Sequence, residues 1–431
     1  MNVPLLITIF IIFVLIIVSF SLKDLDFVAI SLLGCFVAAT ITGLIKGLGI
    51  EAFIAFIEWE AIIIIFSMSI ITKIMKDSNI LEYVAVKLFK ISKGNQRTFF
   101  WLICIVSTLL SAVISDVVVV LILAPIVIRL CHFLKIRSGT YLMGITITIN
   151  IGSIITPFSS GENIIISTAF DLNTFYFMQY YWIFSFSLLF ITIFLIDRFI
   201  LSKEPKIDDQ QKRFVLDLID ADVMIKNKKM FYFNSIAMIT TIVLFVILPL
   251  LYLTAVVSAL LLVLINRKYT KKKMTQLLKD VEWEIIFFFI SLYIIVGCLL
   301  EAGFQELIGL FPFENFNVFL LCLIILIIVS LLSGVVANTP TALIFIPIIA
   351  TLIEIGFPPV PLLFAFIIGV NLGGNFLPQG AACDMMTLKI AEDSGVENFS
   401  YGRLLRTGAV FALIHIAISI GFLFILVLLF G

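Results

Sequence analysis

Long runs of apolar residues alternate with short polar segments along this 431-residue chain. The runs are about 20 residues long and show no strict apolar–polar alternation, which indicates membrane-spanning helices rather than strands. The pattern predicts ten such helices and two further apolar stretches of a different character. We expect the helices at residues 3–21, 26–44, 52–73, 139–170, 176–198, 231–249, 251–266, 283–300, 360–389 and 404–430.

The two further stretches, residues 98–133 and 317–356, are interrupted near their middles by small and polar residues. Lys and Arg collect on the cytoplasmic side of membrane proteins. The first stretch has Lys and Arg residues before and after it, whereas the second lies within a segment, 280–388, that contains neither. We therefore predict two re-entrant helical hairpins, which enter from the cytoplasmic and the external face respectively.

Landmarks of the first half recur in the second half at offsets of 221 to 224 residues. A register this constant in such an apolar chain predicts an inverted-topology repeat. The tryptophans of one landmark, Trp59 and Trp283, are interpreted as interfacial anchors. The landmarks are Glu-Trp-Glu at 58–60 and 282–284, a serine-to-Asp or serine-to-Asn segment at 111–116 and 333–338, and Asn-x-Gly at 150–152 and 371–373.

The predicted fold class is therefore an all-α polytopic membrane protein, with about ten transmembrane helices plus two re-entrant helical hairpins in an inverted-topology repeat. The basic loops place both termini outside a multi-pass protein of the plasma membrane, although Lys23 alone fixes the first loop. The expected segments are a first repeat at 1–200, a cytoplasmic linker at 201–230 and a second repeat at 231–431.

Composition supports a membrane class and excludes several functions. Hydrophobic residues make up 62% of the chain and charged residues only 13%, against roughly a quarter in soluble domains. The net charge is zero and no basic block is present, so nucleic acid is not an expected partner. The six cysteines show no CxxC spacing, and no phosphate loop or nucleophile motif occurs. We expect no enzyme activity and no bound cofactor.

Polar residues mark the middle of each predicted hairpin, deep in the membrane. Ser115 and Asp116 mark the first, and Asn338, Thr339 and Thr341 mark the second. At such a tip the backbone leaves the helix, so N–H groups at the following helix start attract anions and freed carbonyls attract cations. We predict that both tips line a substrate or ion site, and the same residues would also serve as helix caps.

Asp116 has no Lys or Arg near it in sequence between Arg97 and Arg129. A carboxylate near the bilayer centre costs about 2.5–3.5 kcal/mol. Its expected partner is a cation, a proton or polar groups of other helices, which gives it a role in ion coupling. A capped, structural aspartate is the alternative.

Two expected helices, 139–170 and 360–389, each contain glycine and proline within one or two turns. Gly and Pro permit an unwound segment, and unwound backbone at membrane depth must line a cavity. The sequence leaves open whether Glu162 and Asp384, beyond the prolines, belong to the site or to an interface. The predicted site residues here are Asn150, Gly152, Ser153, Thr156 and Asn163 in the first half, and Asn371, Gly373, Gly374, Asn375 and Asp384 in the second. A possible Na⁺ site comprises Asp116, Asn150, Asn338 and Asn371.

At these residues the chain resembles the ion-transporter superfamily, which includes arsenite permeases, NhaD-type sodium/proton antiporters, the melanosomal P protein, citrate transporters and divalent-anion/sodium symporters. The segment from Asn150 to Pro157 is most similar to the arsenite-permease and NhaD branch. The Ser-Asn-Thr tips of the symporter branch are incomplete here, at 115–117 and 337–339. The resemblance implies a scaffold and a transport domain with elevator-type movement, usually within a homodimer.

The predicted function is an ion-coupled secondary active transporter, or permease, in the lipid bilayer. It would move a small inorganic or carboxylate anion, or an arsenite-like solute, coupled to Na⁺ or H⁺. A sodium/proton antiporter of the NhaD type is the alternative, favoured by the unpaired acids. A channel or a membrane-embedded enzyme is disfavoured, because polar positions are confined to four breaks and no catalytic pair is present.

Overall fold

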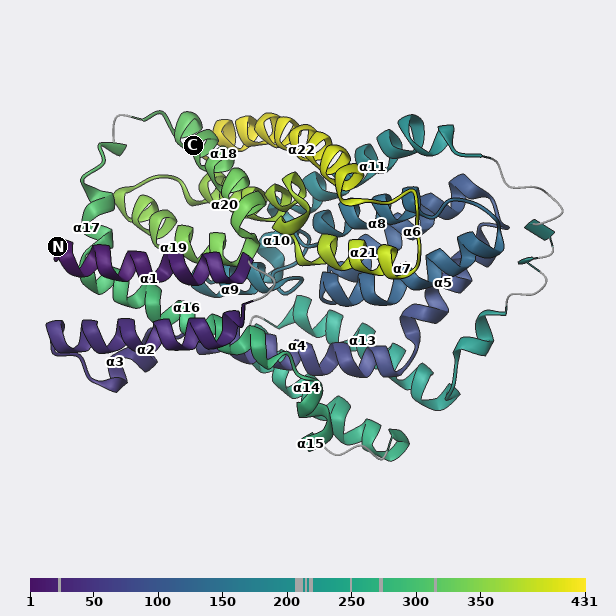
Figure 1. The fold of residues 1–431 in the computed structure, drawn as a ribbon, viewed down its shortest axis with the longest axis horizontal. Coiled ribbons are helices and arrows are strands. Elements are labelled where there is room, and N and C mark those ends of the chain that lie inside the picture. Colours follow the sequence, from purple (N-terminus) through teal and green to yellow (C-terminus); the bar gives the residue numbers. More distant parts are fainter. Residues whose placement is uncertain are drawn as a thin grey trace.

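The computed structural model describes residues 1–21, 25–205, 212–213, 215–216, 220–248, 250–270, 274–313 and 316–431. These residues form helices and contain no β-strand, and ten of the helices are long and apolar enough to cross a membrane (Figure 1). The predicted all-helical, multi-pass membrane fold is therefore confirmed. Lys23 and most of the central part of the expected linker lie outside the described residues.

Seven of the ten long helices fall in predicted spans, and the other three are arms of the predicted hairpins. The seven are α2 (Phe27–Lys46), α11 (Trp182–Phe199), α13 (Lys228–Ile247), α14 (Leu251–Thr270), α16 (Trp283–Ala302), α20 (Pro359–Gly373) and α22 (Tyr401–Phe430). The hairpin arms are α7 (Asp116–Phe133), α18 (Val318–Val336) and α19 (Asn338–Ile355).

Several predicted helices differ in extent from the observed ones. The expected span 52–73 divides into α3 (Ile50–Ala55) and α4 (Trp59–Asp77), at a turn where Phe56 packs against Gly297. The first span, 3–21, coincides with α1 (Val3–Ser21), whereas 176–198 divides into α10 (Thr174–Tyr180) and α11. Short elements complete the connections: η1 (Leu201–Lys203), η2 (Ala221–Met224), α15 (Met274–Leu277) and η3 (Leu278–Asp280).

The first hairpin stretch forms α6 (Gln96–Ser111) and α7, which follow the amphipathic α5 (Ile80–Ile91). Tyr141 Oη donates to the carbonyl of Gln96 at 3.2 Å, so α6 begins beside the start of the next helix, just after α7 ends. Both outer ends of the pair therefore lie at one end of the molecule (Figure 1). This end, named the basic end, carries Lys87, Lys90, Lys93, Arg97, Arg129, Lys135 and Arg137.

The second hairpin stretch, α18 and α19, has its outer ends at the opposite end of the molecule. There α17 (Phe304–Gly309) precedes α18, and Gln305 Nε2 donates to Glu354 Oε2 near the end of α19 at 3.0 Å. The N-terminal amine forms an ion pair with Glu306 in the same region. The two helix pairs thus enter the molecule from opposite ends.

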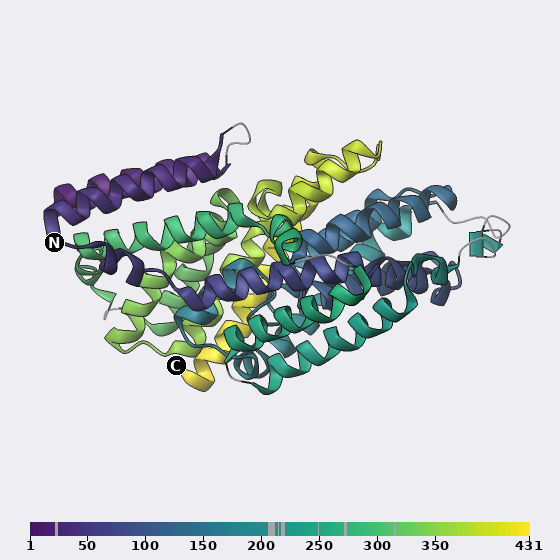
Figure 2. The same ribbon diagram turned by 90° about the horizontal axis from the view of Figure 1, so that it is seen from below.

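Each first arm packs on an interrupted helix through small residues. Ser111 Oγ donates to the carbonyl of Ile149 at 3.0 Å, and Ser333 Oγ donates to that of Val370 at 2.6 Å. A Cβ atom at Gly152 would overlap Ser111 Oγ, so this glycine permits the close approach. Elsewhere α13 and α14 lie side by side along one face (Figure 2).

The two helices against which Ser111 and Ser333 pack are both interrupted, as glycine and proline in the sequence predict. The first divides into α8 (Gly139–Gly152) and α9 (Gly161–Ala169), and the second into α20 and α21 (Ala382–Asp393), with η5 (Gly374–Phe376) and η6 (Pro378–Gly380) between them. We call residues 153–160 break 1 and residues 374–381 break 2. Inside break 1, Asn163 Nδ2 donates to the carbonyls of Ser153 and Thr156, so freed backbone acceptors are satisfied locally.

Candidate functional site

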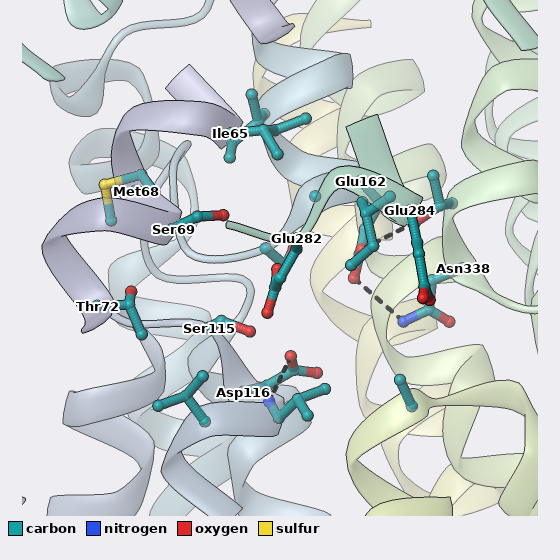
Figure 3. Close-up of a pocket in the computed structure, with 18 of the residues that line it drawn as sticks. Ile65, Met68, Ser69, Thr72, Ser115, Asp116, Glu162, Glu282, Glu284 and Asn338 are labelled. Carbon is teal, nitrogen blue, oxygen red and sulfur yellow. Dashed lines mark hydrogen bonds between the residues drawn. The ribbon is translucent and has the colours of Figure 1, made fainter. Parts of the chain in front are cut away.

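A cavity of about 810 Å³ lies where the two helix-pair tips meet the two breaks (Figure 3). Its remaining walls come from α4, which supplies Ile65, Met68, Ser69 and Thr72, and from α16. Toward the basic end it is lined by Lys73, Lys76 and Asp280.

Four helix N-termini converge on this cavity. These are the starts of α7, α19, α9 and α21, and the cavity lining includes Asp116, Asn338, Gly161 and Ala382, the first helical residue of each. The first N–H groups of a helix have no intrahelical partner and carry the positive end of its dipole. The convergence creates a region suited to negative charge without a basic side chain.

Three acidic residues occupy first turns of the same helices. Asp116 begins α7, Glu162 is the second residue of α9, and Asp384 is the third residue of α21. Within the described part of the chain, none of the three forms an ion pair with Lys or Arg. The helix N-termini are therefore their main source of positive potential.

The tip of α18–α19 contacts the helix that follows break 1. Asn338 Nδ2 donates to Glu162 Oε1 at 3.1 Å, and Thr339 Oγ1 lies 3.5 Å from Glu162 Oε2. Asn338 Oδ1 lies 2.6 Å from Ser333 Oγ and shares this hydroxyl hydrogen with the carbonyl of Val370. We call this contact between the two halves crossing 2 (Figure 3).

The tip of α6–α7 contacts the helix that follows break 2, and we call this contact crossing 1. The Cys383 thiol lies beside the Asp116 carboxylate. Asp116 Oδ1 also accepts from the Val117 N–H at 2.7 Å. Cys383 Sγ additionally lies 3.2 Å from Asn150 Oδ1, which links the crossing to the residues behind it.

Behind the cavity, amide side chains join the two halves again. Asn371 Nδ2 donates to Asn163 Oδ1 at 2.8 Å. Asn150 Nδ2 donates to Asn375 Oδ1 at 2.8 Å and lies 3.5 Å from Asp384 Oδ1. All five side chains are buried. Among the described residues, three buried atoms here lack a hydrogen-bond partner: Ser153 Oγ, Asn371 Oδ1 and Asn375 Nδ2.

The predicted site residues thus fall into two groups. Ser115, Asp116, Asn338 and Thr339 line the cavity directly. The others lie behind it and support the tips and breaks, and they are Asn150, Gly152, Ser153, Thr156, Asn163, Thr341, Asn371, Gly373, Gly374, Asn375 and Asp384.

The supporting group has identifiable roles in packing. Thr156 Oγ1 donates to the carbonyl of Ala112 at 2.5 Å and braces the first tip, while Thr341 Oγ1 donates to that of Ala337 within the second. A Cβ atom at Gly373 would overlap the Ser330 backbone, and one at Gly374 would lie 2.8 Å from Asn338 Oδ1. Only glycine permits these approaches.

The structure also adds acidic residues to the cavity. Glu162, which the sequence left open, lines it, whereas Asp384 does not. Glu282 and Glu284 line it as well, although they were assigned no role in the site. The sequence feature that could have pointed to these two glutamates is the Glu-Trp-Glu landmark, which occurs in both halves. Desolvation by the cavity walls and, secondly, the Asp116 carboxylate raise the pKa of Glu282 above its usual value.

A multi-pass helical fold whose interrupted helices and polar tips enclose one central cavity defines a membrane transporter. The chain belongs to the CitMHS family, described as citrate transporters, whose model matches residues 9–354. It is similar to the uncharacterized transporter Rv2684 of Mycobacterium tuberculosis, with 26% identity over 371 residues that cover 84% of this chain and 85% of that protein. It is also similar to the human P protein, with 22% identity over 458 residues that cover 87% of this chain and 54% of that protein.

The fold is also similar to a solved structure, the Alcanivorax borkumensis YdaH transporter. The TM-score is 0.65 at 10% sequence identity, and the match covers 88% of this chain and 87% of that one. Homologues named as transporters and the family assignment make this protein a transporter rather than an enzyme.

Proposed function

We propose that the protein is a cation-coupled secondary active transporter of a small inorganic or carboxylate anion. The observation that carries the proposal is the convergence, on one cavity, of four helix N-termini and of carboxylates that have no basic partner among the described residues. The N-termini attract the anionic cargo and the carboxylates attract the coupling cation.

The anion would bind where the starts of α7, α19, α9 and α21 face the cavity. Backbone N–H groups there act together with the hydroxyls of Ser115 and Thr339, which also line it. Helix dipoles replace an arginine in this arrangement, so a lining that contains no Arg among the described residues is compatible with an anionic cargo.

The coupling ion, Na⁺ or H⁺, would be held by Asp116 and Glu162. The other candidate ligands are Asn338, whose amide nitrogen donates to Glu162, and Asn150 and Asn371, which lie in the buried amide layer behind the cavity. Binding of the cation neutralises the carboxylates, which lowers the cost of moving the loaded site through the membrane.

We further propose that α6–α7 and α18–α19 are re-entrant hairpins of an inverted repeat. The unit that they form would move by an elevator mechanism, within a homodimer. The opposite entry of the two pairs supports the repeat. The basic end would then face the cytoplasm, with both termini external in a plasma membrane. Single cysteines at positions 97 and 137 should be labelled from the same side. Labelling from opposite sides would contradict the first hairpin.

A sodium/proton antiporter is the second candidate, and one observation favours it. Five acidic side chains line the cavity against two lysines. In that case the acids would carry the cargo itself, and the helix N-termini would only stabilise their charge.

Purified protein in liposomes can separate the two functions. We expect trans-stimulated uptake of at least one of citrate, succinate, sulfate or arsenite that depends on a Na⁺ or proton gradient. Cation exchange with none of these solutes would support the antiporter instead. Flux without saturation or trans-stimulation would contradict both and indicate a channel.

A further inference from the structure

The Glu-Trp-Glu landmark occurs once in each half, and its tryptophan makes the same kind of hydrogen bond in both. Trp59 Nε1 donates to the carbonyl of Ile54 at 3.3 Å, and Trp283 Nε1 donates to that of Leu278 at 2.7 Å. Each indole closes the turn that leads into its helix. The tryptophans are therefore structural, and this role explains their recurrence without reference to the cavity.

The glutamates of the landmark differ between the halves. Glu282 and Glu284 line the cavity, whereas Glu58 and Glu60 do not. Glu282 directly precedes α16 but its side chain makes no capping hydrogen bond to that helix. In the part of the chain that the structure describes, neither Glu282 nor Glu284 has a side-chain hydrogen bond or an ion pair.

Glu282 points into the cavity toward the first tip, and its carboxylate faces that of Asp116 (Figure 3). Both glutamates stand near the start of α16, and Glu282 follows two residues after Asp280, which lines the cavity together with Lys73 and Lys76. Of the two lysines that line the cavity, Lys73 is within ion-pair distance of Asp77 and Asp280, at 3.6 and 3.3 Å. Among the described residues, Lys76 forms no ion pair with either glutamate.

We propose that Glu282 and Glu284 determine which charge form of the cargo passes between the cavity and the basic end of the molecule. The proposal rests on the proposed function, because selection by charge requires an ionic cargo. Two unpaired carboxylates on the wall of a low-dielectric cavity produce a negative potential. This potential slows a fully ionised anion, favours its protonated or ion-paired form, and concentrates the coupling cation.

The potential can be measured without knowledge of the cargo. Ser69 lines the cavity on α4 and is half-buried, and all six native cysteines are buried. The reporter variant Ser69→Cys would be reacted with an anionic and a cationic methanethiosulfonate of similar size. In the background Glu282→Gln/Glu284→Gln, the ratio of anionic to cationic rates should rise about threefold or more, because two nearby charges are removed.

The first half supplies a control with the same change in net charge. Glu58→Gln/Glu60→Gln should leave the rate ratio unchanged, because these residues lie outside the cavity lining. The effect of the first pair should also shrink as ionic strength rises. An equal shift in both pairs, no shift in either, or a reporter that reacts with neither reagent would overturn the proposal.

The outcome is distinguishable from failure of the proposed function. If no anion uptake is measured in liposomes but the rate ratio shifts only in the Glu282→Gln/Glu284→Gln background, the anion-transporter proposal fails. The negative potential that these two glutamates set in the cavity is then still demonstrated. If anion uptake is found but the ratio does not shift, the proposed function stands and these glutamates do not select the cargo.

Discussion

The two crossings join corresponding elements, a tip and the helix after the other half's break, but carry their acid on opposite partners. In crossing 2 the tip supplies the amide of Asn338 and the other half supplies Glu162. In crossing 1 the tip supplies Asp116 and the other half supplies the neutral Cys383. Asp116 and Asn338 are 222 residues apart, and Glu162 and Cys383 are 221 apart, which are offsets of the recurring landmarks. Each crossing therefore holds one carboxylate, whichever partner carries it.

This difference suggests a limit on charge in the membrane. If all four residues of the two crossings were acidic, their carboxylates would repel one another at short range. If none were acidic, no carboxylate would be present to hold a coupling cation. The amide layer behind the cavity repeats the pattern, since the equivalent positions 163 and 384 hold Asn and Asp. The two halves thus make alike contacts, and each contact contains a single carboxylate.

Loss of either carboxylate should have the largest effect. Asp116→Asn and Glu162→Gln each keep the size of the side chain but remove the charge that would hold the coupling ion. We expect gradient-driven uptake in liposomes to fall about 100-fold, equivalent to ~2.7 kcal/mol, while the thermal unfolding temperature changes little. Undiminished coupled uptake in either variant would refute the assigned role of that residue.

A smaller but more specific effect is expected when the acid is moved across crossing 1. The double variant Asp116→Asn/Cys383→Asp gives crossing 1 the arrangement of crossing 2, with little change in side-chain volume. Coupled uptake should recover to within about tenfold of the native protein, ~1.4 kcal/mol. Cys383→Asp alone should impair uptake, because it places two carboxylates together. A double variant no better than Asp116→Asn would show that the two crossings are not interchangeable.

The last effect is on stability rather than on uptake, and it concerns how each half packs its first arm against an interrupted helix. Gly373→Ala would drive a Cβ atom into the Ser330 backbone, whereas Gly152→Ala would meet the Ser111 side chain as well as the carbonyl of Thr108. We expect each to destabilise the protein by about 1–3 kcal/mol, measured as a lower unfolding temperature in detergent. Gly421→Ala, with no atom within 4 Å of the added Cβ, is the control and should be neutral. Equal unfolding temperatures in all three would contradict the close packing.

Much of the fold could be predicted from sequence because its determinants are local. Apolar runs of bilayer length define the helices, and glycine with proline interrupts them near Pro157 and Pro378. The tips could be located for the same reason, since polar residues at Asp116 and Asn338 begin new helices. Helix boundaries near Phe56 could not be predicted, because there the chain turns to meet Gly297 of another helix.

The site was only partly predictable. The sequence by itself determined which residues are polar at membrane depth, because burying them in lipid is so unfavourable that each must have a local reason or a partner. Only the tertiary structure decided which partner: that each tip meets the helix that follows the break of the other half, that Glu162 reaches the cavity while Asp384 stays behind it, and that Glu282 faces Asp116. These pairings join residues 160 or more positions apart, and they follow from how helices pack against one another, which no local pattern encodes.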